Sequence, residues 1–261
     1  MATSDVRELT EAWPADDPPR RARPRQRRRR GFFAGLIGVV GELMITVGVL
    51  LGLFVVWQLW WTDVEGDRSA EQAIEQFEAT IAEVPDSVGQ PRTDAPPEEA
   101  VPADGEVFGT LYVPDWGADY RMPIASGVDL AQVLNDGRVG HYPDTAMPGQ
   151  VGNFSMAGHR QTYGKPFYAI DTLTEGDAVV VQTSQAWYVY TVTSHEIVRP
   201  DQVEVIAPVP GDPGAEPTEA MLTLTSCHPL WSTAERYIVH AELDYWMPLD
   251  EGYPAEQEGD Q

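Results

Sequence analysis

The hydrophobic pattern begins with one long apolar segment near the start of the chain. The 30 residues Phe32–Trp61 include a single charged side chain, Glu42, and the 19 residues Leu43–Trp61 include none. A helix needs about 20 apolar residues to cross the hydrocarbon core of a bilayer, and a buried helix of a soluble domain rarely runs this far without a polar face. The pattern therefore predicts a transmembrane helix within residues 31–61.

Charged and aromatic residues at the two ends of this segment predict its orientation. Arg20–Arg30 is densely basic, which by the positive-inside rule indicates the cytoplasm, and Trp57, Trp60 and Trp61 mark the opposite interface. We expect a single-pass protein of the cell membrane, with a cytoplasmic N-terminus and an extracellular C-terminal region. The alternatives are a cleaved signal peptide or a twin-arginine signal. Cleavage is disfavoured because a signal peptide has an apolar core of only about 7–15 residues, and the Trp-rich end is a poor cleavage site.

Polar and apolar positions beyond the span divide the rest of the chain. Ile74, Phe77, Ile81 and Val84 recur at helical spacing and predict a short helix over residues 69–84. Five prolines among acidic and small residues are typical of a linker at 85–105. We therefore expect five regions, which are a basic cytoplasmic tail at 1–30, the anchor at 31–61, an acidic stalk helix with a Pro-rich linker at 62–105, a folded domain at 106–249 and an acidic tail at 250–261.

The domain from Glu106 onward has the pattern of an all-β protein. Short segments rich in Val, Thr, Tyr and Trp alternate with turns that contain Gly, Pro and Asp. Helical signals are confined to Asp129–Leu134 and Asp201–Ile206, so a β-barrel or a β-sandwich is the expected class. The expected strands are Val107–Val113, Tyr120–Ile124, Asn153–Ala157, Asp177–Thr183, Trp187–His195, Met221–Cys227 and Arg236–Leu243.

Composition and charge narrow the class of function. The formal net charge is −24, and residues 62–261 carry 35 acidic against eight basic side chains. A surface this acidic repels nucleic acid, so we expect no nucleic-acid partner. The chain has one cysteine, Cys227, which excludes an intrachain disulfide and a Cys-rich zinc module.

Cys227 is a candidate nucleophile because of its place at the end of a predicted strand. If Leu222 and Leu224 of the strand Met221–Cys227 face the core, Cys227 points to the other face. The same alternation in the following strand turns Arg236 in the same direction as Cys227. A guanidinium beside a thiol favours the thiolate and can stabilise a developing oxyanion.

A cysteine nucleophile needs an acid/base partner, and the chain offers five histidines. His159 is the candidate because it follows the strand Asn153–Ala157, where a loop-borne catalytic group is expected. His228 follows Cys227 directly and therefore points to the opposite face. For every histidine the competing interpretation is a structural or solvated ring. The histidines and the single cysteine show no recognised ligand spacing, so we expect no metal site.

Separated motifs of the chain resemble those of the sortases, a family of cysteine transpeptidases, over roughly residues 106–245. Thr223–Cys227 resembles the family's Thr-Leu-x-Thr-Cys strand, with Arg236 nine residues later and the histidine motif Asn153–His159 upstream. Ser226 stands where many members have Thr, which is a small departure. Similarity to the class E sortases of actinobacteria is carried by Gly140–Pro143, Met147–Gly149, Tyr163–Phe167 and Cys227–Pro229.

The resemblance implies an eight-stranded β-barrel with the active site at one end of a groove. It implies a transpeptidation in which Cys227 attacks the Thr–Gly carbonyl of a C-terminal sorting signal, Leu-Ala-x-Thr-Gly in preference to Leu-Pro-x-Thr-Gly. An amine of the cell-wall precursor then resolves the thioacyl intermediate. The implied partners are surface proteins that carry the signal, this amine and the membrane. His159 is the implied acid/base, and Arg236 is the implied ligand of the substrate backbone and the oxyanion.

The resemblance also implies substrate contacts, and alternatives stay open beside it. No cofactor is implied, and the family's optional calcium site has no matching motif here. The open alternatives are a cysteine hydrolase on the same barrel, a non-catalytic wall-binding domain and an L,D-transpeptidase, although no Gly precedes Cys227 as the last class would require. The implied substrate-binding residues are His141, Tyr142, Thr225, Ser226 and His228.

Overall fold

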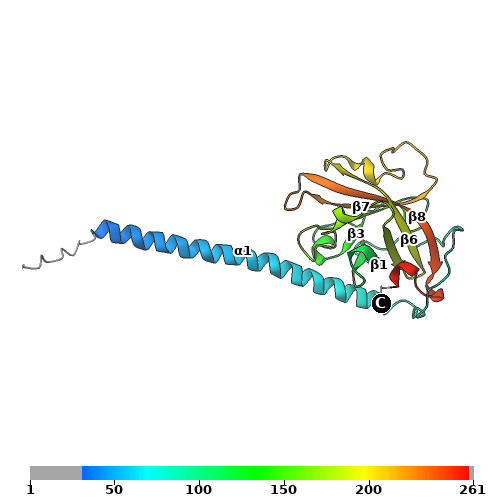
Figure 1. Ribbon diagram of the computed structural model, residues 1–261, viewed down its shortest axis with the longest axis horizontal. Coiled ribbons are helices and arrows are strands. Elements are labelled where there is room, and N and C mark those ends of the chain that lie inside the picture. The colour runs from blue at the N-terminus through cyan, green and yellow to red at the C-terminus, as the bar shows by residue number, and fades with distance from the viewer. Residues whose placement is uncertain (1–30, 259–261) are drawn as a thin grey trace, which may run out of the picture. The chain divides into compact units, whose positions relative to one another are not determined.

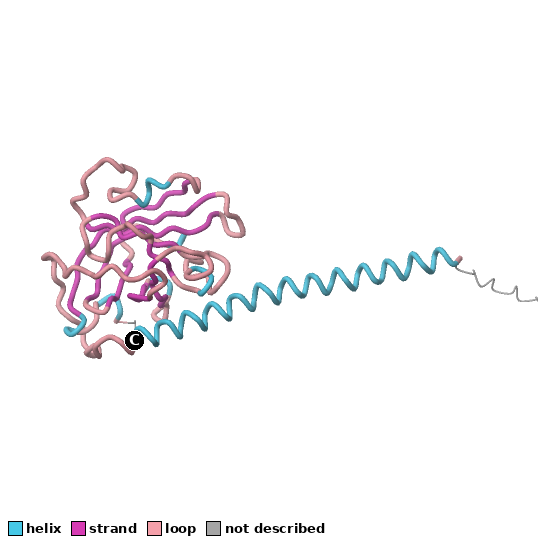
Figure 2. The backbone as a smooth tube through the Cα atoms, turned by 180° about the vertical axis from the view of Figure 1, so that it is seen from behind, coloured by secondary structure: helices cyan, strands magenta, loops and turns pink. Residues whose placement is uncertain are grey.

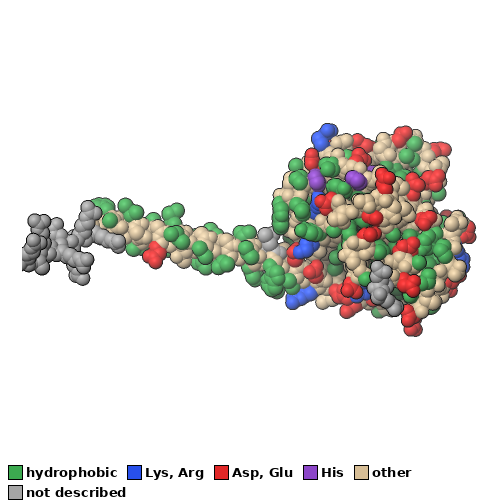
Figure 3. Space-filling view, in the orientation of Figure 1, with side chains coloured by type: hydrophobic (Ala, Val, Ile, Leu, Met, Phe, Trp, Pro, Cys, Tyr) green, Lys and Arg blue, Asp and Glu red, His purple; other side chains and the backbone are tan. Residues whose placement is uncertain are grey.

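A long N-terminal helix is the first element of the computed structural model, which describes residues 31–258 (Figure 1). Helix α1 runs from Phe32 to Glu78, and by length and composition it is able to cross a membrane. Many of its large apolar side chains are exposed, among them Leu43, Phe54 and Trp60, and Figure 3 shows hydrophobic side chains along the helix. The expected basic tail, residues 1–30, lies outside the described residues.

Helix α1 continues well past the apolar span. The sequence predicts a separate short helix over residues 69–84, and this prediction is wrong, because the residues up to Glu78 are the end of α1. No proline occurs between Phe32 and Val84, so nothing in the sequence forces the backbone out of the helix earlier. Ala70, Ile74 and Phe77 are buried at helical spacing. They belong to the compact unit of the chain that begins at Gly52 and contains all the strands.

Eight strands form a closed barrel, which confirms the predicted fold class (Figures 1 and 2). The strands are β1 Val107–Tyr112, β2 Arg121–Ser126, β3 Val139–His141, β4 Gly152–Ala157, β5 Ala178–Thr183, β6 Ala186–Val198, β7 Ala220–His228 and β8 Glu235–Pro248. Their order around the barrel is β1-β2-β3-β4-β7-β8-β6-β5. The pairs β2–β3 and β4–β7 are parallel, and the remaining pairs are antiparallel. The short 3-10 helices are η1 Pro114–Trp116, η2 Leu134–Asp136, η3 Ile170–Thr172, η4 Val203–Ile206, η5 Leu249–Glu251 and η6 Ala255–Gln257.

The barrel core confirms the predicted alternation in the last two strands. Leu222 and Leu224 of β7 and Val239 of β8 lie in the main apolar cluster inside the barrel. The strand that sequence analysis misses is β3, which has only three residues, one of them Gly140. So short a segment carries no readable alternation, and it is held by its neighbours β2 and β4.

Residues 85–105, expected as a linker, are held against the barrel. The main chain of Arg92 pairs with that of Trp246 in β8. The hydroxyl of Tyr188 donates a hydrogen bond of 2.8 Å to Glu99. Prolines keep this segment extended, so its main-chain groups and carboxylates find partners on the barrel instead of within the segment.

The residues after β8 also fold back onto the barrel. Leu249 is buried, and Tyr253 pairs its main chain with Val88. The segment expected as an acidic tail is therefore packed as far as the structure describes it, to Glu258. The division of the chain into five regions stays a prediction.

Candidate active site

Cys227 and Arg236 lie opposite each other where β7 and β8 meet the connecting loop 229–234. Both residues are partly exposed, and alternation places them on the strand face turned away from the barrel core. Nη1 of Arg236 donates to the carbonyl oxygens of Thr233 at 3.1 Å and Glu235 at 2.9 Å, which holds the guanidinium near the loop. The structure thus brings together the predicted nucleophile and the predicted cation.

The parallel pairing of β4 with β7 brings His159 to the same end of the barrel as Cys227. The N–H of Gly158 donates to the carbonyl oxygen of Thr225 at 3.1 Å. In return, the hydroxyl of Ser226 donates to the carbonyl oxygen of Gly158 at 2.8 Å. The two strand ends are therefore joined up to the residues that directly precede His159 and Cys227.

Two loops hold the imidazole ring of His159. Nε2 donates to Oδ1 of Asn135, in η2, at 2.9 Å, so the neutral ring keeps its proton on Nε2 and leaves Nδ1 to accept one. The ring of Tyr163 stacks on it with 5.2 Å between the ring centroids. Burial lowers the pKa of His159, which favours the neutral imidazole.

Arg160 is a buried cation beneath the site, and no motif or spacing in the sequence predicts a role for it. Its side chain is 1% exposed. Nη1 donates to Nδ1 of His228 at 2.9 Å and approaches the carbonyl oxygen of Cys227 at 3.5 Å, while Nη2 pairs with Asp171 at 2.5 Å. The guanidinium also lies over the ring of Tyr237. A charged residue beside a loop histidine is usually exposed, so nothing in the pattern signals this burial.

Three of the predicted substrate-binding residues are enclosed. His141 is 3% exposed, its Nε2 contacts the hydroxyl of Thr145 at 2.9 Å and the carbonyl oxygen of Ala146 at 3.1 Å, and burial lowers its pKa to about 4. These contacts are those of an enclosed ring, and the substrate contact of His141 stays a prediction. Thr225 and Ser226 are also buried, and the Ser226 hydroxyl is engaged by the main chain as described above.

The other two predicted substrate-binding residues are accessible beside the thiol. Tyr142 is partly exposed; burial raises its pKa, the nearby guanidinium of Arg236 opposes this rise, and the charge of Cys227 adds to it. His228 is also partly exposed. Because Arg160 can only donate to its Nδ1, the neutral ring of His228 carries its proton on Nε2.

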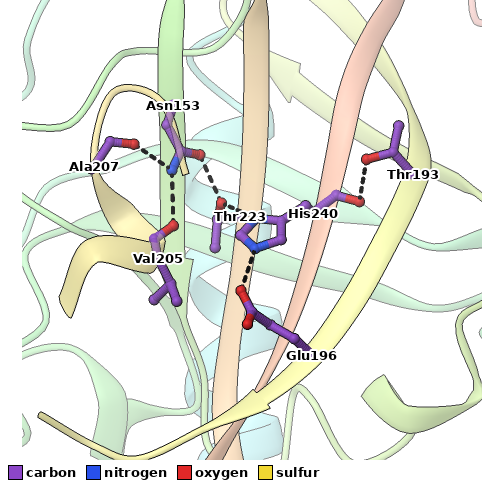
Figure 4. A network of polar contacts seen from close by, with 7 residues as sticks. All are labelled: Asn153, Thr193, Glu196, Val205, Ala207, Thr223 and His240. Atoms are coloured by element: carbon purple, nitrogen blue, oxygen red, sulfur yellow. Dashed lines mark hydrogen bonds and ion pairs between the residues drawn. The ribbon is translucent and has the colours of Figure 1, made fainter. Parts of the chain in front are cut away.

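A buried polar network centres on Thr223 of β7 (Figure 4). Alternation places Thr223 on the same face of the strand as Cys227. The hydroxyl of Thr223 contacts Oδ1 of Asn153 at 2.8 Å and Nδ1 of His240 at 2.9 Å. Nδ2 of Asn153 donates to the carbonyl oxygen of Ala207 at 3.0 Å, and Nε2 of His240 reaches Glu196 at 3.4 Å. The network ties the segment after η4 to the barrel. Burial lowers the pKa of His240, and Glu196 opposes that effect.

Within residues 31–258, no group of three His, Cys, Asp or Glu side chains is arranged to hold a metal ion. The carboxylates of Asp171 and Glu196 pair instead with Arg160 and His240. The residues that the structure describes therefore provide no candidate metal centre.

Comparison with known families identifies the class of this fold and site. The sortase domain family matches residues 111–244, a range that includes His159, Cys227 and Arg236. The chain therefore belongs to the sortase family, whose members are cysteine transpeptidases.

Among the relatives, two sortases of Streptomyces coelicolor are similar over most of this chain. Sortase SrtE1 is 36% identical over 238 residues, which are 88% of this chain and 64% of the relative. Sortase SrtE2 is 36% identical over 229 residues, which are 84% of this chain and 87% of the relative. The match thus spans a little under two thirds of the length of SrtE1.

Solved structures give the same result. The SrtA sortase from Actinomyces oris is 47% identical with a TM-score of 0.62, covering 66% of this chain and 98% of that structure. Sortase E1 from Streptomyces coelicolor, solved with a tripeptide in its active site, is 38% identical with a TM-score of 0.54, covering 58% and 96%. The predicted resemblance to sortases, and to class E among them, is confirmed.

Proposed function

We propose that this chain is a membrane-anchored transpeptidase that cleaves a C-terminal sorting signal between Thr and Gly and joins the Thr to a cell-wall amine. The observation that carries this proposal is the pairing of Cys227 with Arg236, beside the strand end that bears His159, in a chain of the sortase family. The proposed partners are surface proteins that carry the signal and the amine of a cell-wall precursor.

In the first half of the reaction, the thiolate of Cys227 attacks the carbonyl carbon of the Thr residue. A bond forms between Sγ and that carbon, and the carbonyl oxygen becomes an oxyanion that the guanidinium of Arg236 stabilises by charge-assisted hydrogen bonds. Protonated His159 gives its proton to the Gly nitrogen as the carbon–nitrogen bond breaks. The Thr is then held on Cys227 as a thioester, and the peptide that begins with Gly leaves.

In the second half, an amine attacks the thioester carbon and the carbon–sulfur bond breaks, which restores the thiolate. His159, now neutral, takes the proton from the attacking amine. The Asn135 contact supports this role, because it occupies Nε2 and leaves Nδ1 for both proton transfers. If water attacks in place of the amine, the same steps give hydrolysis.

We propose that Tyr142 and His228 contact the sorting signal, since they are the predicted substrate-binding residues that are partly exposed. Preference for Ala over Pro at the second position of the signal is proposed from the likeness to class E relatives. Thr225 and Ser226 would act by fixing the end of β7, which their burial supports.

Helix α1 is the proposed membrane anchor, with the N-terminus in the cytoplasm and the barrel outside. Its length and its exposed apolar surface support this, as does the basic segment Arg20–Arg30 in the sequence. Protease added to intact cells should remove the barrel and spare the N-terminus. Full protection of the barrel would contradict this topology.

The activity is tested with the full chain in detergent micelles. The chain is incubated with Leu-Ala-x-Thr-Gly and Leu-Pro-x-Thr-Gly peptides, with and without an added amine, and the products are identified by mass. We expect cleavage between Thr and Gly and an amine-dependent ligation product. Cleavage that yields only the free acid at every amine concentration would identify a hydrolase, and no cleavage of any such peptide would contradict the proposal.

A further inference from the structure

The end of α1 beyond the apolar span meets loop backbone close to the candidate active site. Gly66 is buried, and a Cβ built on it would lie 2.6 Å from the amide nitrogen of Gly164. A Cβ built on Gly137 would lie 2.8 Å from the carbonyl carbon of Gly66. Both distances are shorter than real Cβ contacts, so at Gly66 the helix backbone touches two loops with no room for a side chain between them.

Side chains reinforce this contact along the same part of α1. Oδ2 of Asp63 pairs with Nζ of Lys165, in the loop that contains Gly164, at 2.8 Å. Further along, Arg121 of β2 pairs with Glu71 at 2.5 Å and with Glu78 at 2.9 Å. Together with the buried apolar side chains described above, these pairs fix residues 63–78 on the barrel unit.

The loop beneath Gly66 has an unusual backbone that needs support. Tyr163, Gly164 and Lys165 have φ values of 54°, 75° and 42°. Residues other than glycine rarely adopt this left-handed region, so Tyr163 and Lys165, on either side of Gly164, cost conformational free energy that surrounding contacts must offset. The helix supplies contacts at Gly164 and at Lys165.

Each of the two loops that Gly66 touches also contacts His159. Tyr163, next to Gly164, stacks on the imidazole ring. Asn135, two residues before Gly137, hydrogen-bonds to Nε2 of that ring. The helix therefore lies directly behind both groups that orient His159.

We propose that residues 63–78 of α1 are a positioning element of the active site, which holds the Tyr163 loop and the Asn135 turn in place around His159. This inference rests on the proposed function, in which His159 transfers the protons. It makes the barrel and residues 63–78 one catalytic unit, so that shifting this part of α1 changes the rate of reaction without any change in the groups that react.

The test is a matched pair of substitutions in the full chain, Gly66→Ala and Gly52→Ala. Both add one methyl group to α1 and gain the same helix propensity, but a Cβ at Gly52 meets nothing within 4 Å. The measurements are kcat and KM for peptide cleavage, the ring NMR signals of His159, and amide hydrogen exchange in residues 135–138 and 160–165.

For Gly66→Ala we expect kcat to fall by roughly tenfold to a hundredfold with little change in KM, shifted His159 signals and faster exchange in both loops. Gly52→Ala should match the wild type in every measurement. Unchanged exchange and unchanged His159 signals in Gly66→Ala would overturn the inference, and so would faster exchange with an unaltered kcat.

A milder pair guards against misfolding of Gly66→Ala. Asp63→Asn removes the ion pair to Lys165, and Glu65→Gln alters an exposed acid of the same helix. Asp63→Asn should shift the His159 signals in the same direction as Gly66→Ala and should lower kcat, and Glu65→Gln should do neither. Equal behaviour of the two variants would count against the inference.

An inactive wild type would overturn the proposed function alone, because the NMR and exchange results still decide whether the helix positions His159.

Discussion

Cys227 and Arg236 face each other across the β7–β8 ladder, one on each side of the connecting loop. Directly opposed residues of an antiparallel pair have Cα atoms only about 4.5–5.5 Å apart. The two main chains therefore place the residues side by side, and hydrogen bonds from Nη1 to the carbonyl oxygens of Thr233 and Glu235 hold the guanidinium near the loop. These fixed contacts make the chemistry at residue 236 sensitive to the shape of its side chain and not only to its charge.

Replacing Arg236 by Lys should therefore fail to preserve activity. A planar guanidinium can donate to two substrate oxygens at once, whereas an ammonium group is a point charge on a flexible stem. Because loss of one oxyanion donor costs about 10²–10³ in kcat, we expect a loss of at least that order in both Arg236→Lys and Arg236→Gln. Steady-state cleavage of the peptide measures it, and substantial activity in Arg236→Lys would show that charge alone suffices.

Asn135 should act on the reaction through His159. Asn135→Ala removes the acceptor of the Nε2 proton, so the ring can rotate or change tautomer. We expect kcat to fall roughly tenfold to a hundredfold and the pH–rate profile to shift, with KM little changed. Gln132→Ala, an exposed residue of the same loop, is the control. A rise in KM with an unaltered pH profile would instead indicate that Asn135 contacts the substrate.

The sequence predicts the positions of Cys227 and Arg236 well, because strand alternation fixes the faces of both strands. Leu222 and Leu224 mark the core side of β7, and Cys227 follows from them by counting. Asn135 and Arg160 are different, because their roles depend on how distant loops pack. Asn135 is 24 residues from His159 in the chain, and no periodicity links a loop amide to a ring.

Burial is the second property that local pattern does not reveal. His141 lies in a Gly-His-Tyr-Pro stretch with turn character, yet β2 and β4 enclose it in the barrel wall. The end of α1 is similar. Its residues read as a short amphipathic helix, and only the packed structure shows that Gly66 marks a backbone contact.

Removing the charge of Asp171 should destabilise the fold, because it breaks the ion pair with the buried Arg160. Arg160 is 1% exposed and Asp171 is 42% exposed, so Asp171→Asn leaves a buried guanidinium without its anion. A fully buried pair broken in this way costs about 3–5 kcal/mol; because Asp171 is partly solvated, we expect roughly 1–3 kcal/mol here. Urea unfolding measures the loss, and Asp119→Asn, at an exposed acid, should be neutral. Equal stability of the two variants would contradict this account of Arg160.

His141 should make the fold less stable in mild acid. Burial lowers its pKa from 6.5 to about 4, so between these values the unfolded chain binds a proton that the folded chain does not. The contribution of His141 to the free energy of unfolding is therefore fully present above pH 6.5. It declines as the pH falls toward 4, by roughly 3 kcal/mol in all. In His141→Gln, which does not titrate, unfolding free energy measured across this range should fall less steeply than in the wild type. Parallel pH dependence in the two proteins would refute the prediction.

The central claim, that Cys227 carries the acyl group of a cleaved sorting signal, is tested most directly by trapping that intermediate. The full chain is incubated with a Leu-Ala-x-Thr-Gly peptide without amine, quenched in acid, digested and analysed by mass spectrometry, with Cys227→Ala as the control. The account predicts that the fragment containing Cys227 gains the mass of the peptide up to its Thr, and that added amine removes this mass. Cleavage between Thr and Gly by Cys227→Ala, or an adduct on any other residue of the wild type, would contradict it.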